Sequence, residues 1–481
     1  MIGLLAAIIP AVGAPVAQLV PVRSKAPLLL VGVALLNVGV ALTIALGVPS
    51  AASPTFLEGF FVADATSRLF LLLVNGIFLG ISTYVWTRVR AEPALQQGIE
   101  RYVGFSLAFI AASNLALLSH HLIALWIFLE LTTLAAVPLI QHGNLPAAFQ
   151  ASWKYFLFSA VGLALTFLGF NCLGRSMELA GTHEVTFFLD GLARGAPHEP
   201  DVWWRLGLAL IFLGFGTKLG LAPMYSWLPD TYDAAPPATT ALLAAVQFNV
   251  ALLGLLRVLQ VVRATHPSAV SNELIALGVA TMIISSLSII AARNYTRLIA
   301  YASLNHAGVI AVGLGVGGEA AYGVVVYLVS NAFIKAILFL SAGKIRSYYQ
   351  TDDMREVSGL IKDLPYTGLF FMVGMFALLG LPPFGSFLGE LIILSGLMAR
   401  GFVSVFVAFC TVLTIAFVAT GRSVFPMIWG ESRRKVNWAG DPMATRVPKL
   451  LFLGAVIAMG IYVPSPVNEL FRQVAKTLGG P

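Results

Sequence analysis

Four charged residues lie inside apolar segments that are otherwise long enough to cross a membrane. They are Glu130 in HLIALWIFLELTTLAAVPLI, Lys218 in GFGTKLGLAP, Lys335 in SNAFIKAILF and Glu390 in GSFLGELIIL. Each such charge costs roughly 2.5 to 3.5 kcal/mol at the middle of a bilayer, so its retention favours ion pairing or conduction. A nearby opposite charge favours the ionised form and isolation favours the neutral form, so proton affinity at these sites can change with distance. We therefore predict a buried proton relay; the alternatives are a static Glu130–Lys218 ion pair and an interfacial Lys335.

A histidine and an asparagine are further candidates for the proton relay. His306 lies in the middle of LIAYASLNHAGVIAVG, and an imidazole titrates near neutral pH, although a lone histidine in a helix is often only a packed hydrogen-bonding residue. Asn331 precedes Lys335 by one helical turn, so both can project from one face and hold water between them. We expect a proton relay of Glu130, Lys218, His306, Lys335 and Glu390, supported by Asn331. His120 and His121 are candidates for an outer mouth, although interfacial placement alone would also explain them.

The composition indicates that these residues lie in a membrane. The 481 residues are 58% hydrophobic and 11% charged, with a mean hydropathy of +0.87, which is typical of a polytopic membrane protein rather than a water-soluble domain. Lys and Arg are scattered through short loops despite the formal charge of +7, so they predict membrane topology rather than a nucleic-acid interface. Cys172 and Cys410 stand alone in apolar runs, which excludes the paired spacing of a zinc or iron–sulfur site, and we expect no metal.

The elements that must position the relay are apolar runs of about 18 to 25 residues, the length that crosses a bilayer as a helix. We predict an all-α fold of about 14 transmembrane helices, near residues 3–20, 26–47, 67–87, 101–119, 121–140, 153–173, 205–224, 238–262, 272–292, 298–316, 320–343, 366–398, 401–421 and 448–464. With the N-terminus outside, 18 Lys and Arg residues fall on the cytoplasmic side and nine on the outer side. The positive-inside rule then places both termini and the polar stretch 174–204 on the outer face.

One repeat interrupts two of these helices. GLAPMYSWL at 220–228 and GLPPFGSFL at 380–388 share Gly, Leu, Pro, Ser and Leu in register. Breaks in corresponding places of two halves are typical of transporters with inverted repeats, although two Pro kinks can look alike by chance. We expect the helices to break at Gly220, Pro223, Pro382 and Pro383. The stretch GLGVGG at 313–318 matches a nucleotide-binding pattern, but no strand precedes it, so we do not interpret it as a nucleotide site.

The residues from about 100 to 425 resemble a known family, the antiporter-like membrane subunits of complex I, Mrp antiporters and group 4 membrane-bound hydrogenases. The resemblance rests on FLELTTLAAVPLI, ASWKYFLFSAVGLAL, GFGTKLGLAPMYSWLPDTYDAAPPATTALL, RNYTRLIAYASLNHAG, NAFIKAILFLSAGKI and GLPPFGSFLGELIIL. The sequence of these segments is most similar to that of hydrogenase-4 component F. The family pattern has ionisable residues where this chain has Glu130, Lys218 and Glu390. It often has a Lys where this chain has Asn249. The resemblance implies Asn249, Asp230 and Tyr225 as further supporting polar residues.

The family's His residues around WLPD are Tyr225 and Tyr232 here, and its Lys-Arg pair reads Thr296 and Arg297, which leaves the cytoplasmic route of proton uptake undefined. The resemblance implies a chain without its own cofactor, in the inner membrane of a prokaryote. It implies lipid, other membrane subunits including homologues, and a peripheral redox or other soluble arm as partners.

It also implies three parts of the chain: helices 1 to 3 in residues 1–100, a proton-translocating core in 101–425 with repeats at about 101–262 and 272–421, and a last helix with a short tail in 426–481.

The function expected is proton translocation in a complex I-like or membrane-hydrogenase complex. The alternatives are the membrane subunit of a Mrp-type sodium/proton antiporter or of a two-component inorganic-carbon uptake system. A scaffold that has lost conduction would be expected to lose the buried charges, and all four are present.

Overall fold

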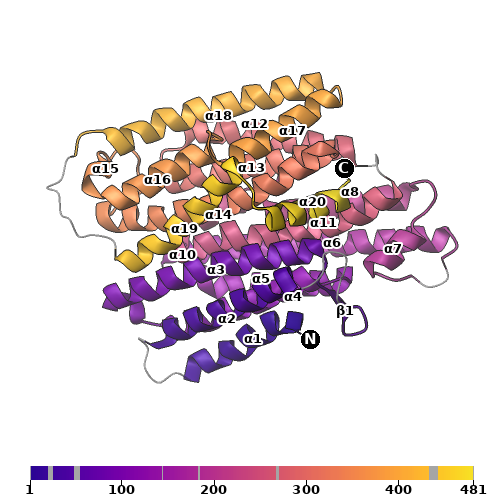
Figure 1. The fold of residues 1–481 in the computed structure, drawn as a ribbon, viewed down its shortest axis with the longest axis horizontal. Helices are drawn as coiled ribbons and strands as arrows, with labels where there is room; N and C mark the ends of the chain where they lie inside the picture. Colours follow the sequence, from indigo (N-terminus) through magenta and orange to yellow (C-terminus); the bar gives the residue numbers. More distant parts are fainter. Residues whose placement is uncertain are drawn as a thin grey trace.

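Long apolar helices that lie side by side make up most of the chain (Figure 1). The structure is a computed structural model that describes residues 2–19, 25–47, 55–143, 145–182, 185–266, 270–432 and 442–479. The helices are α1 (Ile2–Leu19), α2 (Ala26–Gly47), α3 (Ala65–Ala91), α4 (Ile99–Leu118), α5 (Leu122–Ile140), α6 (Pro146–Leu179), α7 (Leu189–Gly195), α8 (Val202–Leu219), α9 (Trp227–Ala234), α10 (Pro237–Ala241), α11 (Phe248–Thr265), α12 (Ser271–Ala291), α13 (Tyr295–Val316), α14 (Glu319–Tyr349), α15 (Leu360–Asp363), α16 (Pro365–Leu378), α17 (Gly385–Ala399), α18 (Val403–Trp429), α19 (Met443–Ile461) and α20 (Ser465–Thr477). The short strands β1 (Thr55–Phe56) and β2 (Phe61–Val62) pair antiparallel, with Thr55 opposite Val62.

The fold class predicted from the sequence is confirmed. Within the described ranges, 12 helical segments are long and apolar enough to cross a membrane, and α1, α16 and α17 are shorter apolar helices. Taking α16 and α17 as one interrupted span, and adding α1, gives the fourteen spans expected. α1 begins, and α20 ends, at the same end of the bundle, where α7 also lies (Figure 1). We call this the terminal end, and the end that holds α10 and α15 the opposite end.

Both predicted interruptions are present, and they share one backbone geometry. α8 ends before Gly220 (φ +76°), and the Leu221 amide donates to the Gly216 carbonyl at 2.7 Å. α16 ends before Gly380 (φ +66°), and the Leu381 amide donates to the Phe376 carbonyl at 3.1 Å. This left-handed C-terminal cap requires a residue that tolerates positive φ, which explains the Gly in both repeats.

At each break a side chain also donates to a carbonyl of the last helical turn. The Thr217 carbonyl accepts from the Trp227 indole at 2.8 Å, and the equivalent Ala377 carbonyl accepts from the Ser386 hydroxyl at 2.6 Å. A membrane tolerates broken helices only where such groups find partners in protein or water. The two interrupted helices run in opposite directions: α8 runs from the terminal end toward α10, and α16 and α17 run from α15 toward the terminal end (Figure 1).

A third irregularity lies between the two breaks. The π-helical turn η3 (Leu242–Gln247) joins α10 to α11 into one nearly continuous helix, and every residue of η3 is buried. π-Turns inside α-helices are rare and occur frequently at functional sites. This helix is therefore irregular where it passes through the core of the bundle.

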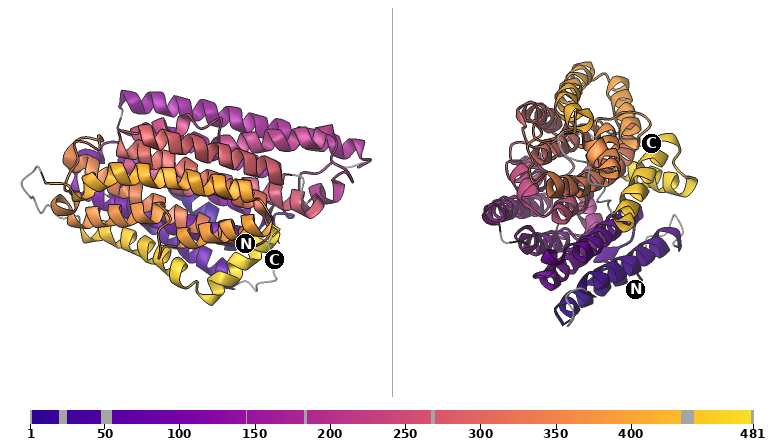
Figure 2. Two further views of the ribbon diagram at one scale, coloured as in Figure 1. Left: turned by 90° about the horizontal axis from the view of Figure 1, so that it is seen from above. Right: turned by 90° about the vertical axis from the view of Figure 1, so that its left-hand side faces the viewer.

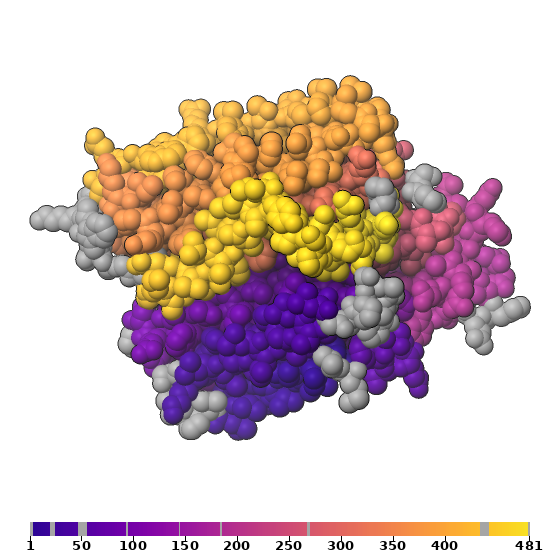
Figure 3. Space-filling view, viewed as in Figure 1, coloured from indigo at the N-terminus to yellow at the C-terminus, as the bar shows by residue number. Residues whose placement is uncertain are grey.

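The last two helices lie across the seam between the two parts of the bundle. Figure 3 shows the yellow segment between the indigo and purple first part and the orange second part. In α19, Phe452 packs against Gly80 of α3 and Phe333 of α14. In α20, Asn468 accepts from the Tyr322 hydroxyl at 2.8 Å, and Thr477 bonds Gln260 of α11 at 3.0 Å. α20 was not predicted, because its polar face gives it a low hydropathy.

Three buried asparagines fasten the peripheral helices α1 and α2 to α3 and α4. Figure 2 shows this indigo pair at the edge of the bundle. Pro10 lacks an amide hydrogen and so frees the Ala6 carbonyl in α1, which accepts from Asn37 at 3.1 Å and from Asn114 at 2.6 Å. Asn75 links the other two through its side-chain amide, at 3.2 Å from Asn37 and 2.9 Å from Asn114. Four helices therefore share one hydrogen-bond network inside the membrane.

Asn114→Ala is expected to destabilise the N-terminal helices by about 1 to 2 kcal/mol, since it removes an interhelical donor and leaves the Ala6 carbonyl and the Asn75 side chain under-satisfied. The measurement is thermal unfolding of the purified subunit in detergent. Asn171→Ala is the matched control, because Asn171 is exposed and its one side-chain hydrogen bond among the described residues is to the Phe167 carbonyl of its own helix. Equal unfolding temperatures for the two variants would contradict the role of the network.

Candidate functional site

The charged residues singled out in the sequence lie on four different helices and face the interior. Lys218 of α8 is 3% exposed, Lys335 of α14 is 1% exposed and Glu390 of α17 is 8% exposed, while Glu130 of α5 is half-buried. Their helices pack around α11 and α13, which carry Asn249 and His306. The relay residues thus lie in the core of the bundle and not on its lipid-facing side.

The first cluster surrounds the break in α8. The Lys218 ammonium donates to the Thr133 hydroxyl of α5 and lies 5.9 Å from the centre of the Tyr155 ring. Thr133 follows Glu130 by three residues, so both project from one face of α5 toward Lys218. Among the described residues, Oε2 of Glu130 is buried without a hydrogen-bond partner, while the Lys218 ammonium is bonded to Thr133. The two residues therefore share a site without forming a static pair.

The second cluster lies where η3 meets α11. Both side-chain polar atoms of Gln247 and Oδ1 of Asn249 are buried and have no partner in the described part of the chain. Nδ2 of Asn249 donates to the Ala245 carbonyl of its own helix at 2.7 Å. Between them in sequence, the Phe248 ring lies 3.8 Å from the Lys335 ammonium. The start of α11 therefore places an aromatic face next to Lys335, and unpaired polar groups lie on both sides of Phe248 in the sequence.

α14 carries three polar side chains, each one turn from the next: Tyr327, Asn331 and Lys335. Nζ of Lys335 and Oδ1 of Asn331 are buried, and neither has a hydrogen-bond partner within the described ranges. A buried polar group without a partner costs about 1 to 3 kcal/mol, so groups of this kind are satisfied by ordered water in folded proteins. This row of α14 is therefore a candidate path for water and protons.

The third cluster surrounds the break between α16 and α17. His306 of α13 hydrogen-bonds the Tyr327 hydroxyl through Nδ1, and the Glu390 carboxylate is a near neighbour of that hydroxyl. The carboxylate presses against the α-carbon of Gly380, where a Cβ would collide with Oε2. Gly380 thus ends α16 and also makes room for the acid. Tyr327 connects His306, Glu390 and the α14 row.

His120 and His121, the candidates for an outer mouth, lie at the terminal end but differ in environment. His120 pairs with Asp190 at 3.1 Å beside a cavity of about 500 Å³. His121 caps α5 and stacks on Phe60 and Phe188, and burial lowers the pKa of its imidazole below the ordinary value. Burial thus disfavours the charged form of His121, whereas His120 has an acidic partner.

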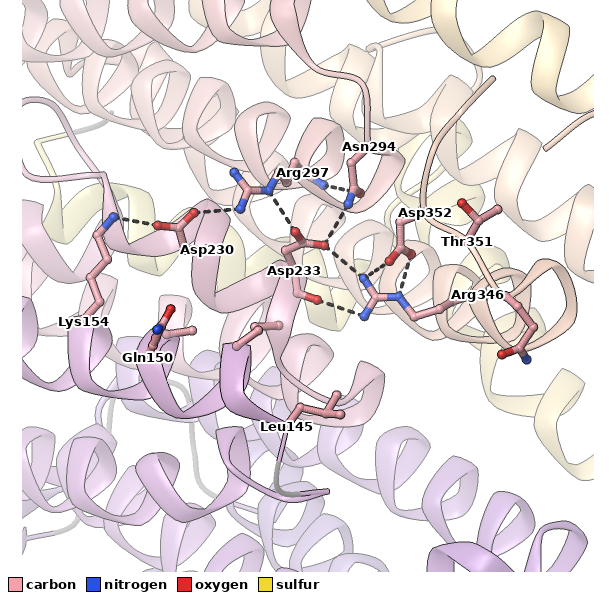
Figure 4. Close-up of a pocket in the computed structure, with 14 residues that line it drawn as sticks. Leu145, Gln150, Lys154, Asp230, Asp233, Asn294, Arg297, Arg346, Thr351 and Asp352 are labelled. Carbon is pink, nitrogen blue, oxygen red and sulfur yellow. Dashed lines mark hydrogen bonds and ion pairs between the residues drawn. The ribbon is translucent and has the colours of Figure 1, made fainter. Parts of the chain in front are cut away.

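Asp230 and Tyr225, two of the supporting residues, lie on the opposite side of the relay from these histidines. Tyr225 occupies the bend between α8 and α9, where it is half-buried against the core. Asp230 of α9 binds Lys154 of α6 at 2.6 Å and Arg297 of α13 at 3.0 Å (Figure 4). Asp230 therefore belongs to a charged cluster at the opposite end of the bundle.

Four residues of these clusters were not among the predicted site residues: Thr133, Tyr155, Gln247 and Tyr327. Neutral Thr, Tyr and Gln side chains cost less to bury than a charge, so they do not stand out within an apolar run. Gln247 carried a signal, since two amide side chains within three residues, Gln247 and Asn249, are unusual in a buried apolar helix. Tyr155 and Tyr327 are identified only by their contacts with Lys218 and His306.

Comparison with known proteins places the chain in a family. Residues 119–416 match the family model described as "NADH:quinone oxidoreductase/Mrp antiporter, TM". The chain is 28% identical over 435 residues to a hydrogenase-4 component F homolog of Methylacidiphilum infernorum (isolate V4), covering 87% of this chain and 89% of that protein. It is 26% identical over 426 residues to an Na(+)/H(+) antiporter subunit of Bacillus subtilis (strain 168), covering 87% of this chain and 83% of that protein.

The fold is also that of a solved structure. A chain of the membrane-bound sulfane sulfur reductase (MBS), described as an archaeal respiratory membrane complex, superposes with a TM-score of 0.87 over 99% of this chain and 98% of that chain, at 23% identity. Because the family model covers more than half of the 481 residues, the chain belongs to the antiporter-like transmembrane family of NADH:quinone oxidoreductase and Mrp antiporter subunits.

Proposed function

We propose that this chain is a proton-translocating subunit of a larger energy-converting membrane complex, and that protons cross it along Glu130, Lys218, Lys335, His306 and Glu390. The observation that carries the proposal is the row of buried ionisable and unpaired polar groups between the two helix breaks. It begins at Lys218 beside the first break, passes η3 and the α14 row, and ends at Glu390 against Gly380. Such groups are costly in a membrane and usually mark ion pathways.

Family membership supports the proposal, and the relatives indicate two candidate kinds of complex. Similarity to a hydrogenase-4 component F homolog supports a membrane hydrogenase or complex I-like assembly with homologous membrane subunits and a soluble redox arm. Similarity to an Na(+)/H(+) antiporter protein supports the second candidate, a Mrp-type antiporter. In both cases the core is residues 101–425, with repeats near 101–262 and 272–421, and residues 1–100 and 426–481 flank it.

The experiment that separates the two candidates is ion transport by the purified complex in sealed vesicles. The tagged chain is isolated with its partners, the partners are identified by mass spectrometry, and the vesicles contain dyes for pH and for Na⁺. Redox turnover that moves protons without Na⁺ supports the first candidate. Proton movement that requires Na⁺ movement supports the second, and a sealed, active complex that moves neither ion would overturn the proposal.

We also propose that the terminal end of the bundle faces outward, since the Lys and Arg excess falls on loops at the opposite end. A Cys placed at Pro481, which lies outside the described residues, is expected to react with an impermeant maleimide added to intact cells. Arg355→Cys is the control, because Arg355 is exposed at the opposite end and should react only in inside-out vesicles. Labelling of the Pro481 position only from the cytoplasmic side would reverse the assignment.

A further inference from the structure

A cavity of about 680 Å³ opens at the opposite end of the bundle, and both halves of the chain contribute to its wall (Figure 4). α6 and α9 come from the first half, and α13, α14 and the segment after α14 come from the second. Six alternating charges run along this wall: Lys154, Asp230, Arg297, Asp233, Arg346 and Asp352. Three are positive and three negative, so the wall is strongly polar but carries no net charge.

Two aspartates of α9 form the middle of this row, one turn apart, and their surroundings differ. Asp233 accepts from Asn294 at 2.9 Å, Arg297 at 2.8 Å and Arg346 at 3.0 Å, and its side chain is 20% exposed. Asp230 has two cationic partners, Lys154 and Arg297, and its side chain is 34% exposed. Asp233 is therefore held on three sides, whereas Asp230 is more open to the cavity.

Asp230 is also the aspartate that lies nearer to the relay. It follows Trp227 by one turn, about 4.5 Å along the helix axis. The Trp227 indole donates to the carbonyl of Thr217, the residue before Lys218, and packs on Tyr155 with 5.2 Å between ring centres. On the other wall, Lys154 binds Asp230, and the next residue, Tyr155, lies beside the Lys218 ammonium. α9 and α6 thus both connect Asp230 with the surroundings of Lys218, α9 through Trp227 and α6 through Lys154 and Tyr155.

We propose that this cavity is the inlet through which protons reach the relay, and that Asp230 is the carboxylate that receives them; the inference rests on the proposed function. A hydronium ion in the cavity gives its proton to the Asp230 carboxylate. The neutral acid then gives the proton to the neutral Lys218 amine, passing the Tyr155 hydroxyl, so that the carboxylate is restored and the ammonium is formed. This inlet needs neither the His residues that are Tyr225 and Tyr232 here nor the Lys that is Thr296 here, and it keeps Arg297 as a partner of Asp230.

The first test compares Asp230→Asn with Asp233→Asn, two substitutions of equal size in the same charge row. An inlet at Asp230 predicts that Asp230→Asn slows proton uptake into vesicles by about tenfold or more, because an amide cannot carry the proton. It predicts that Asp233→Asn slows uptake by at most about threefold, the effect of a weakened partly exposed ion pair. If the charged residues only stabilise the contact between the two halves, Asp233→Asn should have the larger effect, because Asp233 has more partners. That result would overturn the proposal.

The second test blocks the cavity directly in the intact complex. Gln150→Cys, on the cavity wall, is modified with an impermeant, positively charged thiol reagent added from the side of the opposite end. The expected result is a loss of proton uptake that Arg355→Cys, exposed at the same end but outside the cavity lining, does not show after the same treatment. Normal uptake after full modification at position 150, in a complex that pumps before treatment, would reject the inlet and leave the proposed function intact. A complex that never pumps would instead reject the proposed function.

Discussion

Glu390→Gln is expected to abolish proton transfer, by about a hundredfold or more, while leaving the subunit assembled in its complex. Glutamine keeps the shape that fits against Gly380 and keeps a polar side chain near Tyr327, but it cannot ionise. In the structure the acid is the last ionisable group of the buried row, with Lys335 and His306 preceding it along the Tyr327 side of α14.

The comparison variant is Asn249→Ala, which should be milder. Asn249 cannot carry a proton at physiological pH, and its one hydrogen bond within the described chain is to the Ala245 carbonyl of its own helix. Proton uptake is measured in vesicles containing the reconstituted complex, at equal subunit content for each variant. Normal pumping by Glu390→Gln, or a greater loss from Asn249→Ala, would show that protons leave by another route.

The sequence predicted the helices well because membrane spans are defined by one property, the length of an apolar run. Both breaks were also predictable, since the paired GLAPMYSWL and GLPPFGSFL segments place Gly and Pro at the same positions. The predicted ends were less accurate: α6 extends from Pro146 to Leu179, beyond the predicted 153–173. Hydropathy detects the part of a helix inside the membrane and not the polar turns that continue into water.

The charged residues of the site could be predicted from the sequence, but its uncharged polar residues could not. Lys218, Lys335 and Glu390 stand out against apolar neighbours, whereas the roles of Thr133 and Tyr327 depend on which helices touch. No periodicity in α5 indicates that Thr133 would hold the Lys218 ammonium, or in α14 that Tyr327 would link His306 to Glu390. The Asn37, Asn75 and Asn114 network is another such case, because it depends on a carbonyl freed by Pro10 on a different helix.

Lys218→Met and Glu130→Gln are each expected to reduce proton uptake by about a hundredfold. One face of α5 carries two oxygen-bearing side chains near the Lys218 ammonium: Thr133 binds it in this structure, and Glu130 lies one turn away with a buried, unpartnered oxygen. A charge in hydrocarbon is costly without a counter-charge, so movement of the ammonium from the hydroxyl to the carboxylate would favour its protonated form and the reverse movement its release. Removing either charge leaves the other without this switch.

The control that isolates the switch is Thr133→Val, which keeps the shape of the side chain and removes its hydroxyl. The ammonium then has only Glu130 on that face of α5, so the pair should form permanently and uptake should fall by a smaller factor, about two- to tenfold. All three variants are compared for proton uptake in vesicles at equal subunit content and after confirmed assembly. If Lys218→Met and Glu130→Gln both assemble and pump normally, the two charges are structural, and the relay has to begin deeper in the bundle, at Lys335.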